Sequence, residues 1–342
     1  GGLVGLVPGS DGGAPIMYEV PSSFAEVDRV PLTNGAFLFL TMASDDLGTS
    51  LACGFGGCTA SVDGGASYEK LSLPKHLVTT QDVKYEPTSD LFAVTGLFVG
   101  GQLGAAVGDG RAEWSYIGVD ADLVYDGVGI RYGSFPSSDV GYVTAGFWND
   151  TDTVGLSEDM HWLTAQLAVS KESGQLKMQS TAPLPLVGDD DGKGFWAQVL
   201  KTTDGGDSWS VVYEDIDNGY YPNDISCSSE TQCTFALEGV GNPKIMTTSD
   251  GGATWETFED TSGGSSLLPV RSTKDGDVWV AGGGDTGRFW HLAPESGAAW
   301  ESYEVPKNTA ALVTSFSDFA KGVVFGTAAL ASQLCSVFGV EV

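Results

Sequence analysis

One short turn pattern recurs along the chain at a nearly constant interval. Three copies are clear: SVDGGASY at 61–68, TTDGGDSW at 202–209 and TSDGGATW at 248–255. In each copy an aromatic residue follows the Asp by five positions, and the three Asp residues are separated by 141 and then 46 positions. Because 141 is three intervals of 47, the spacing predicts two less regular copies between the first and the second.

The expected intermediate copies are present in a degraded form. GDGRAEW ends at Trp114, and LSEDMHW ends at Trp162 with Ser157 in the position of the Asp. APESGAAW extends the series to Trp300, and GSDGGAPIMYEV adds an N-terminal copy in which Asp11 precedes the aromatic residue by seven positions. The turns are therefore expected near residues 11–18, 63–68, 109–114, 157–162, 204–209, 250–255 and 295–300.

Short alternating or apolar runs fill the intervals between the turns. The interval that ends at Trp255 contains DISC, CTFALEGV, PKIMTTSD and ATWETFED, which have the composition of four strands. Four short antiparallel strands in each interval of 45 to 48 residues are typical of a propeller blade. The sequence predicts an all-β chain folded as a single β-propeller domain over residues 1–342. We expect seven four-stranded blades, or six if the N-terminal turn is not a true copy.

The two ends of the chain are expected to complete one blade together. The 42 residues after Trp300 can finish one blade and begin another with ALVTSFSD and GVVFGTAA, which the N-terminal strand then completes. A shared sheet removes the free edges that would otherwise aggregate. The charge-free stretches 91–108 and 322–340 fall where the repeat requires strands, so we expect no membrane insertion. Since no Met or basic leader begins the chain, its start is expected to be a processed or trimmed end.

The composition of the turn has a structural explanation. An Asp at the start of a turn accepts hydrogen bonds from backbone N–H groups two or three residues further on. The glycines that follow adopt positive φ at little steric cost, and the aromatic residue packs over the turn. Structural roles are therefore expected for Asp11, Asp63, Tyr68, Asp109, Trp114, Trp162, Asp204, Trp209, Asp250, Trp255 and Trp300.

The three clear copies resemble Asp-boxes, whose consensus is Ser-x-Asp-x-Gly-x-Thr-Trp. This motif recurs in sialidases, sortilin-type receptor domains, some xyloglucan- and cellulose-active glycosidases, and photosystem II assembly-factor propellers. The resemblance implies a β-propeller in which each box joins the third and fourth strands of a blade, on the side away from any active site. By blade count and size, the chain is most similar to the assembly-factor-like seven-bladed group. The motif is specific for architecture, and it leaves the activity open.

The same resemblance raises the possibility of a sialidase-like site. In DRVPLTNGAFLFL, Arg29 takes the place of the arginine that holds the substrate carboxylate in the aromatic-Arg-Ile-Pro motif of sialidases. The other candidates would be Arg131 and Arg271 for the arginine cluster, Asp45 and Asp46 for the acid/base, and Tyr132 or Tyr220 for the nucleophile.

Several features weigh against that activity. Asp28 replaces the aromatic residue of the motif, and its charge would compete with a substrate carboxylate for Arg29. Pairing of Arg29 with Asp28 or Glu26 at a strand start explains the residue equally well. A neutral-sugar glycosidase would need only two carboxylates about 5–9.5 Å apart in the central funnel. Candidates near the innermost strands include Asp45, Asp82, Asp139 and Asp224, and a solvated surface role is the simpler explanation for each.

No cofactor or metal is expected, although three acidic loops could offer oxygen ligands to Ca²⁺. None of these loops has the spacing of an EF-hand, so we favour a solvated role for all three. Asn149, in the sequence NDT, fits an N-glycosylation acceptor in a secreted protein. The acidic residues of the three loops are Asp120, Asp122 and Asp126, then Asp150 and Asp152, then Asp189 to Asp191.

Charge and cysteine content restrict the partners and the compartment. With 45 acidic and 16 basic residues the formal net charge is −29, which repels nucleic acid and anionic membranes and favours cations and basic partners. A salty habitat would produce the same composition. Cys53 with Cys58, and Cys227 with Cys233, could each close across a short hairpin in an oxidising compartment, leaving Cys335 over.

These observations predict a secreted or lumenal, non-enzymatic β-propeller that binds a protein or glycan partner. The alternative is a glycoside hydrolase, sialidase-like or acting on neutral sugars, with its site in the central funnel. A third hypothesis, resting on the family resemblance, is an assembly factor for a membrane complex. The sequence does not indicate the oligomeric state.

Overall fold

The computed structural model describes most of the chain between residues 39 and 304, with further strands at both ends. The ranges are 3–7, 16–20, 39–45, 47–54, 56–98, 102–124, 130–148, 195–216, 218–239, 241–261, 266–283, 287–294, 299–304, 312–320, 323–329 and 335–341. Side chains are described only between residues 41 and 304.

The described strands form four-stranded antiparallel sheets in chain order. The first sheet contains β3 (Phe39–Ser44), β4 (Ser50–Gly54), β5 (Gly57–Ser61) and β6 (Glu69–Leu71). The second contains β7 (Leu77–Glu86), β8 (Leu91–Phe98), β9 (Gln102–Gly108) and β10 (Trp114–Gly118), followed by the 3₁₀ turn η1 (Ala121–Leu123). The third contains β11 (Ile130–Ser134), β12 (Gly141–Trp148), β13 (Phe195–Thr202) and β14 (Ser210–Asp215). The fourth contains β15 (Tyr220–Cys227), β16 (Cys233–Gly239), β17 (Lys244–Thr248) and β18 (Glu256–Glu259).

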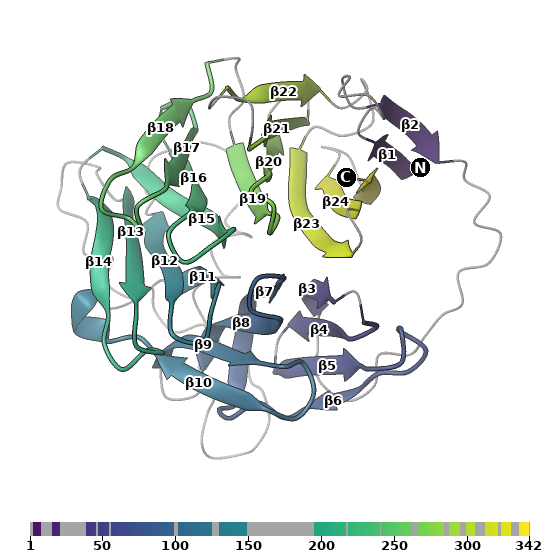
Figure 1. Cartoon of the computed structure of the whole chain (residues 1–342), viewed down its shortest axis with the longest axis vertical. Coiled ribbons are helices and arrows are strands. Elements are labelled where there is room, and N and C mark those ends of the chain that lie inside the picture. The colour runs from purple at the N-terminus through teal and green to yellow at the C-terminus, as the bar shows by residue number, and fades with distance from the viewer. Residues whose placement is uncertain are drawn as a thin grey trace, which may run out of the picture.

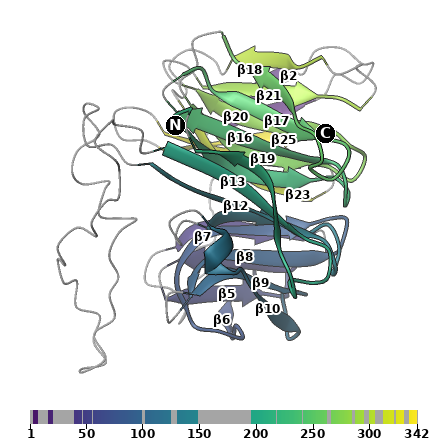
Figure 2. The same cartoon turned by 90° about the vertical axis from the view of Figure 1, so that its left-hand side faces the viewer.

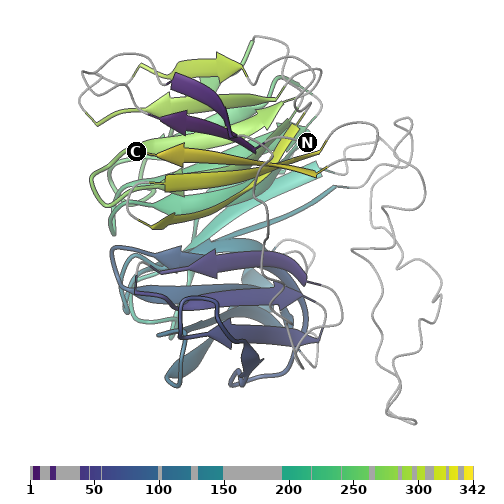
Figure 3. The ribbon, with the colours of Figure 1, turned by 90° about the vertical axis from the view of Figure 1, so that its right-hand side faces the viewer.

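The remaining strands belong to one nine-stranded sheet that contains both ends of the chain. One part contains β19 (Ser266–Ser272), β20 (Val278–Gly283), β21 (Arg288–Leu292) and β22 (Glu301–Glu304). The other contains β23 (Leu312–Ala320), β24 (Val323–Ala329), β25 (Cys335–Glu341), β1 (Leu3–Val7) and β2 (Ile16–Val20). A single pairing of Gly283 with Leu312 joins the two parts. Strand β1 pairs with β25 in parallel, so the chain ends share a sheet as predicted (Figure 3).

The sheets are arranged as the blades of a ring (Figure 1). Their first strands, β3, β7, β11, β15, β19 and β23, contact one another in that order, and β23 also contacts β3. These innermost strands surround the axis, and the later strands of each sheet lie progressively further out (Figure 1). The prediction of a β-propeller is therefore confirmed.

The interval between residues 119 and 215 differs from the sequence interpretation. That interval was expected to hold two blades, but its described strands form one sheet, in which β12 and β13 are neighbours although 46 residues separate them (Figure 2). The turn predicted at 157–162 therefore falls between the second and third strands of a sheet, outside the described residues. This arrangement favours the six-blade alternative, and the blade count stays a prediction.

Hydrophobic clusters between neighbouring blades form the core. In β8, side chains alternate between the two faces, so Phe92 and Val94 pack toward the β3–β6 sheet while Ala93 packs toward the β11–β14 sheet. Sheets covered on both faces are consistent with the nearly continuous burial of β15 and β20. In the described part of the chain, no helix is long and apolar enough to cross a membrane. The charge-free stretch 91–108 contains β8 and β9 instead.

Candidate functional site

Each clear copy of the turn is built around one Asp carboxylate. In the first copy Asp63 accepts hydrogen bonds from the Ser67 backbone N–H (2.9 Å), the Ser67 hydroxyl (2.6 Å) and the Ser61 hydroxyl (2.8 Å). The Gly65 N–H donates to Ser61 Oγ at 2.8 Å. The backbone bond therefore spans four residues, further than the two or three that the sequence suggested. Gly64 and Gly65 have φ of 74° and 86°, a region that glycine enters without strain.

The second and third copies repeat this geometry. Asp204 accepts from the Ser208 N–H at 2.9 Å, and Asp250 accepts from the Thr254 N–H at 2.9 Å. Hydrogen bonds from the neighbouring hydroxyl and amide groups lower the pKa of Asp63, Asp204 and Asp250 to about 2. The three carboxylates are thus engaged in shaping their turns.

These turns mark one end of the ring. The backbone N–H of Gly64 donates to Gly48 O at 2.9 Å, and Gly251 donates to Thr231 O at 2.9 Å. Each acceptor lies in the connection between the first and second strands of the same blade. Both kinds of connection therefore lie at one end, which we call the turn end. The connections from one blade to the next lie at the far end.

The aromatic residue of each turn binds the preceding blade or its own. Trp209 Nε1 donates to Gly118 O at 2.9 Å, Trp255 Nε1 donates to Val212 O at 2.9 Å, and Tyr68 shares a 2.8 Å hydrogen bond with Ser50. The indole of Trp255 also packs edge-to-face on Phe235, with ring centroids 4.9 Å apart. These contacts stabilise the packing of neighbouring blades.

The irregular copies differ in detail. Asp109 Oδ1 accepts from three consecutive backbone N–H groups, those of Arg111, Ala112 and Glu113. Trp114 begins β10, and the ring of Trp300 lies 5.8 Å from that of Phe258. The predicted positions Asp11 and Trp162 lie outside the described residues.

A buried ionic cluster crosses the centre of the ring. Lys84 on β7 donates to Asp224 on β15, with Nζ 2.5 Å from Oδ1, and to the carbonyl of Ile225. Arg271 on β19 donates to the other carboxylate oxygen of Asp224 at 2.6 Å. Lys84 is 1% exposed and Asp224 is 3% exposed, so the pair is removed from water. Three blades therefore contribute charged side chains to one network on the axis.

Two further acidic residues of β7 extend this cluster. Asp82 Oδ2 lies 3.5 Å from Lys84 Nζ, and burial raises the pKa of Asp82, although the neighbouring charge of Lys84 opposes that shift. Glu86 accepts a hydrogen bond from the Phe135 N–H at 3.2 Å, and burial raises its pKa to about 7. Because residues two apart on a strand share a face, these three charges line up on one side of β7. Sequence reasoning missed Lys84 and Glu86, although the alternation in DVKYE carries the signal.

Two of the arginines proposed for a sialidase-like site have other partners in the structure. Arg271 is 5% exposed and paired with Asp224, while Arg131 lies over the rings of Tyr132 and Tyr221, at 5.6 and 5.2 Å from their centroids. Burial raises the pKa of Tyr132. Arg29 and Asp46 lie outside the described residues.

The remaining catalytic candidates also have structural surroundings. Asp45 accepts from the N–H groups of Leu47 (2.9 Å) and Thr49 (2.6 Å) in a connection at the turn end. The ring centroid of Tyr220 lies 4.0 Å from Lys244 Nζ, and the Tyr220 hydroxyl donates a hydrogen bond to Asn242 O. Asp139 is exposed and lies at the turn end, where its carbonyl accepts from Gly205.

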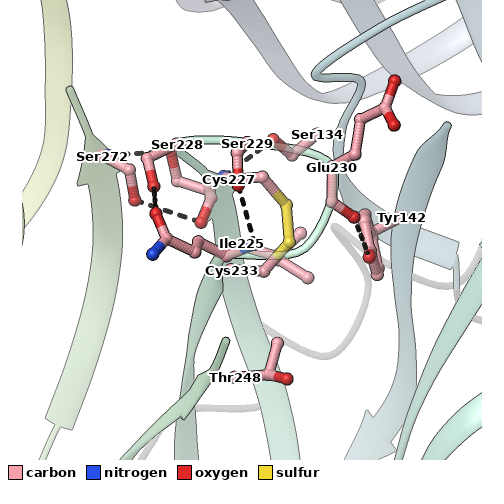
Figure 4. The surroundings of a disulfide bond; sticks show 12 residues. Ser134, Tyr142, Ile225, Cys227, Ser228, Ser229, Glu230, Cys233, Thr248 and Ser272 are labelled. Carbon is pink, nitrogen blue, oxygen red and sulfur yellow. Dashed lines mark hydrogen bonds between the residues drawn. A yellow bond between two sulfur atoms is a disulfide. The ribbon is translucent and has the colours of Figure 1, made fainter. Parts of the chain in front are cut away.

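Two disulfides join adjacent strands. Cys53 is bonded to Cys58 across β4 and β5, and Cys227 is bonded to Cys233 across β15 and β16. In Figure 4, Ser134 and Ser272 lie on either side of Cys227. The Cys227 N–H donates to Ser134 Oγ at 3.0 Å, so the disulfide lies beside a contact between blades. Cys335 lies on β25, whose side chains are outside the described set.

The acidic loops show no cation site within the described ranges. No group of three or more potential ligands gathers there. Asp120 caps η1 by accepting from the Asp122 N–H at 3.0 Å. Asp126, Asp150, Asp152, Asp189 to Asp191 and the glycosylation candidate Asn149 lie outside the described residues, so those hypotheses stay predictions.

Comparison with known proteins places the chain by fold. No protein-family model and no curated protein sequence matches it. The WD40 β-propeller domain of Doa1 matches with a TM-score of 0.50 and 12% identity, over 95% of this chain and 82% of that chain. An ancestral GH74 enzyme matches with a TM-score of 0.51 and 12% identity. That match covers 89% of this chain and 36% of the enzyme. YCF48 bound to a D1 peptide matches with a TM-score of 0.48 and 16% identity, over 90% of this chain and 79% of that one.

The similar structures share an architecture but little sequence, so they define the class of this protein by fold alone. The chain is a β-propeller of the kind that the repeated turn predicted. Fold similarity of this degree does not transfer an activity, which must be argued from the site.

Proposed function

We propose that this propeller is a non-enzymatic module that binds a protein or glycan partner on its surface. The observation that carries the proposal is the buried cluster of Lys84, Asp224 and Arg271 on the axis. The two carboxylate oxygens of Asp224 each face a cationic side chain, and the network connects the innermost strands of three blades. A binding role at the surface needs no group from this cluster. An assembly role would be one form of that binding function.

Chemistry on the axis of the ring would require the cluster to open. A general acid or nucleophile must come within hydrogen-bond reach of its substrate. Asp224 is 3% exposed, and separating it from Lys84 and Arg271 would leave charges buried without compensation. The cluster therefore supports a structural role for these residues.

One observation favours the alternative of a glycoside hydrolase. Asp82 and Asp224 both face the ammonium group of Lys84, and burial raises the pKa of Asp82. A carboxyl group whose pKa is raised by burial, beside a second carboxyl group, has the chemistry of a general acid. This function would need substrate access that the burial of both groups opposes.

The disulfides support a secreted or lumenal location. Cross-strand disulfides persist where the surroundings are oxidising and are rare in reducing compartments. Cys53–Cys58 and Cys227–Cys233 are both buried in the blades.

The test compares hydrolysis with binding. The purified protein and its Asp82→Asn variant are incubated with aryl glycosides, including neutral sugars and a sialoside, and both are applied to a glycan array and a displayed-peptide library. We expect no hydrolysis, and ligands that bind both proteins equally. Hydrolysis by the wild type that disappears in a folded Asp82→Asn variant would replace the binding function with the enzymatic one.

A further inference from the structure

A groove of ≈ 480 Å³ lies between two neighbouring blades, where the turn before β14 meets the end of β10. One wall is formed by the end of β10 and by η1, including Gly118 and Leu123, and the other by residues 206–209 of the turn before β14. In Figure 1 this is the outer edge of the ring, where the short blue coil of η1 lies between β10 and β14. The groove is far from the buried cluster on the axis.

Trp209 supplies the aromatic surface of the groove. Its Nε1 is held by Gly118 O at 2.9 Å, and the side chain remains partly exposed. In the next blade, the ring of Trp255 packs against two other aromatic rings. Its centroid lies 4.9 Å from that of Phe235 and 6.2 Å from that of Tyr213. No such aromatic partner accompanies Trp209 among the described residues. The ring packs against the hydrophobic cluster between the two blades, and its exposed part lines the groove.

Gly118 contributes its main chain to the groove. Its carbonyl accepts the indole hydrogen bond of Trp209, just as Val212 accepts that of Trp255 in the following blade. A Cβ added at Gly118 would meet only the Tyr116 ring, at 3.3 Å, because residues two apart on a strand share a face. Tyr116 packs toward the β3–β6 sheet, so the groove is bounded at this point by backbone.

The polar groups of the groove accept hydrogen bonds and carry negative charge. Asp120 and Asp207 are exposed on opposite walls, and no Lys, Arg or His lines the groove. The nearby donors are already used: the Ser208 hydroxyl and N–H bind Asp204, and Trp209 Nε1 binds Gly118 O. A sugar hydroxyl needs both donors and acceptors, whereas the Lys ammonium and the Arg guanidinium only donate.

We propose that this groove binds a Lys or Arg side chain from a basic segment of a partner protein. The cation lies on the face of Trp209, between the carboxylates of Asp120 and Asp207. A cation over an indole contributes about 0.5–2 kcal/mol according to its desolvation. The formal net charge of −29 steers such a partner toward the surface. The proposal rests on the binding function above and names the chemistry of its partner.

The test uses a fluorescent Arg–Gly repeat peptide of ten residues, measured by fluorescence anisotropy at low and at physiological salt. The decisive variant is Asp207→Asn, because it removes one carboxylate from the groove and keeps the size of the side chain. We expect a loss of affinity of about twofold to fivefold for Asp207→Asn. Asp275→Asn is the matched control, since it removes one exposed charge from a turn in another blade and should change affinity by less than twofold.

Three results would overturn the proposal. Equal binding by the wild type and a folded Asp207→Asn variant would place any contact outside the groove. Equal losses in Asp207→Asn and Asp275→Asn would reduce the effect to net charge. Displacement of the peptide by xylo-oligosaccharides would assign the groove to carbohydrate. None of these results affects the proposed non-enzymatic function, which rests on the closed cluster on the axis and has its own hydrolysis test.

Discussion

Lys84 and Asp224 are 140 positions apart in the sequence, and their side chains meet at 2.5 Å on the axis of the ring. Lys84 belongs to the β7–β10 blade and Asp224 to the β15–β18 blade, with a further blade between them in chain order. The contact therefore spans blades that are not neighbours. It can form only when the blades have assembled around a common axis, so it couples local folding of the sheets to closure of the ring.

Replacement of Lys84 with Met should destabilise the protein strongly. Met preserves most of the side-chain volume but removes one of the two cations that neutralise buried Asp224. Breaking a buried ion pair typically costs about 3–5 kcal/mol. Chemical denaturation monitored by tryptophan fluorescence measures the change. Lys70→Met, at an exposed position of β6, is the control and should have little effect. A Lys84→Met loss no larger than the control would mean that the pair does not stabilise the ring.

Ionisation of the buried Glu86 carboxyl group should make the protein less stable as the pH rises from about 4.5 to about 7. Burial raises its pKa from 4.5 in the unfolded chain to about 7 in the folded one, so the folded state binds the proton more tightly. That stabilisation is complete below pH 4.5 and is lost as the pH passes through 7. Denaturation midpoints across this range should fall less steeply for Glu86→Gln than for the wild type. An unchanged slope in Glu86→Gln, or the same flattening in the exposed control Glu69→Gln, would contradict the assignment.

The sequence predicted the architecture because the fold repeats its local chemistry. Each turn needs an Asp acceptor and glycines with positive φ, and Gly205 and Gly206 adopt φ of 69° and 94° in the copy at 202–209. A turn centred on an Asp recurs in each of the four described four-stranded sheets, so a periodic signal remains even where a copy is irregular, as at Asp109. The copy predicted at 157–162 is the exception, because it falls between β12 and β13.

The pairing of β12 with β13 and the central cluster were harder to predict, because both depend on contacts between distant parts of the sequence. The register of β12 with β13 pairs Trp148 with Phe195, a contact across 46 intervening residues that spacing alone cannot locate. The cluster depends on which side chains of different blades reach the axis, and this follows from ring closure rather than from local sequence. Only the alternation of Asp82, Lys84 and Glu86 marks it in advance.

The turn at 202–209 should lose stability in acid through its carboxylate. Hydrogen bonds lower the pKa of Asp204 from 3.8 to about 2, so its contribution is present above pH 3.8 and is lost as the pH falls toward 2. Asp204→Asn should lower the denaturation midpoint at neutral pH. It should also make that midpoint depend less on pH between pH 4 and pH 2. Asp207→Asn, in the same turn, takes no part in these bonds and is the matched control. Identical acid profiles for Asp204→Asn and the wild type would show that these bonds do not contribute.

Removal of the Cys227–Cys233 disulfide should loosen the contact between two blades. The disulfide closes the segment 228–232, whose Glu230 carbonyl accepts a 2.7 Å hydrogen bond from the Tyr142 hydroxyl on β12. Closing so short a loop restricts the unfolded chain and so stabilises the folded state by about 2 kcal/mol. The Cys227→Ser/Cys233→Ser variant should lose about that much stability, measured by denaturation without reductant.

Tyr142→Phe separates the two contributions within this region. It keeps the disulfide and removes only the hydrogen bond to Glu230, so a loss of about 1 kcal/mol is expected. In the serine variant the segment 228–232 is no longer held against β12, so adding Tyr142→Phe there should cost less than it does in the wild type. A coupling of this kind, obtained from the double-mutant cycle, tests whether the disulfide positions the loop. Fully additive losses would show that the disulfide acts on the unfolded chain alone and leaves the contact between blades unchanged.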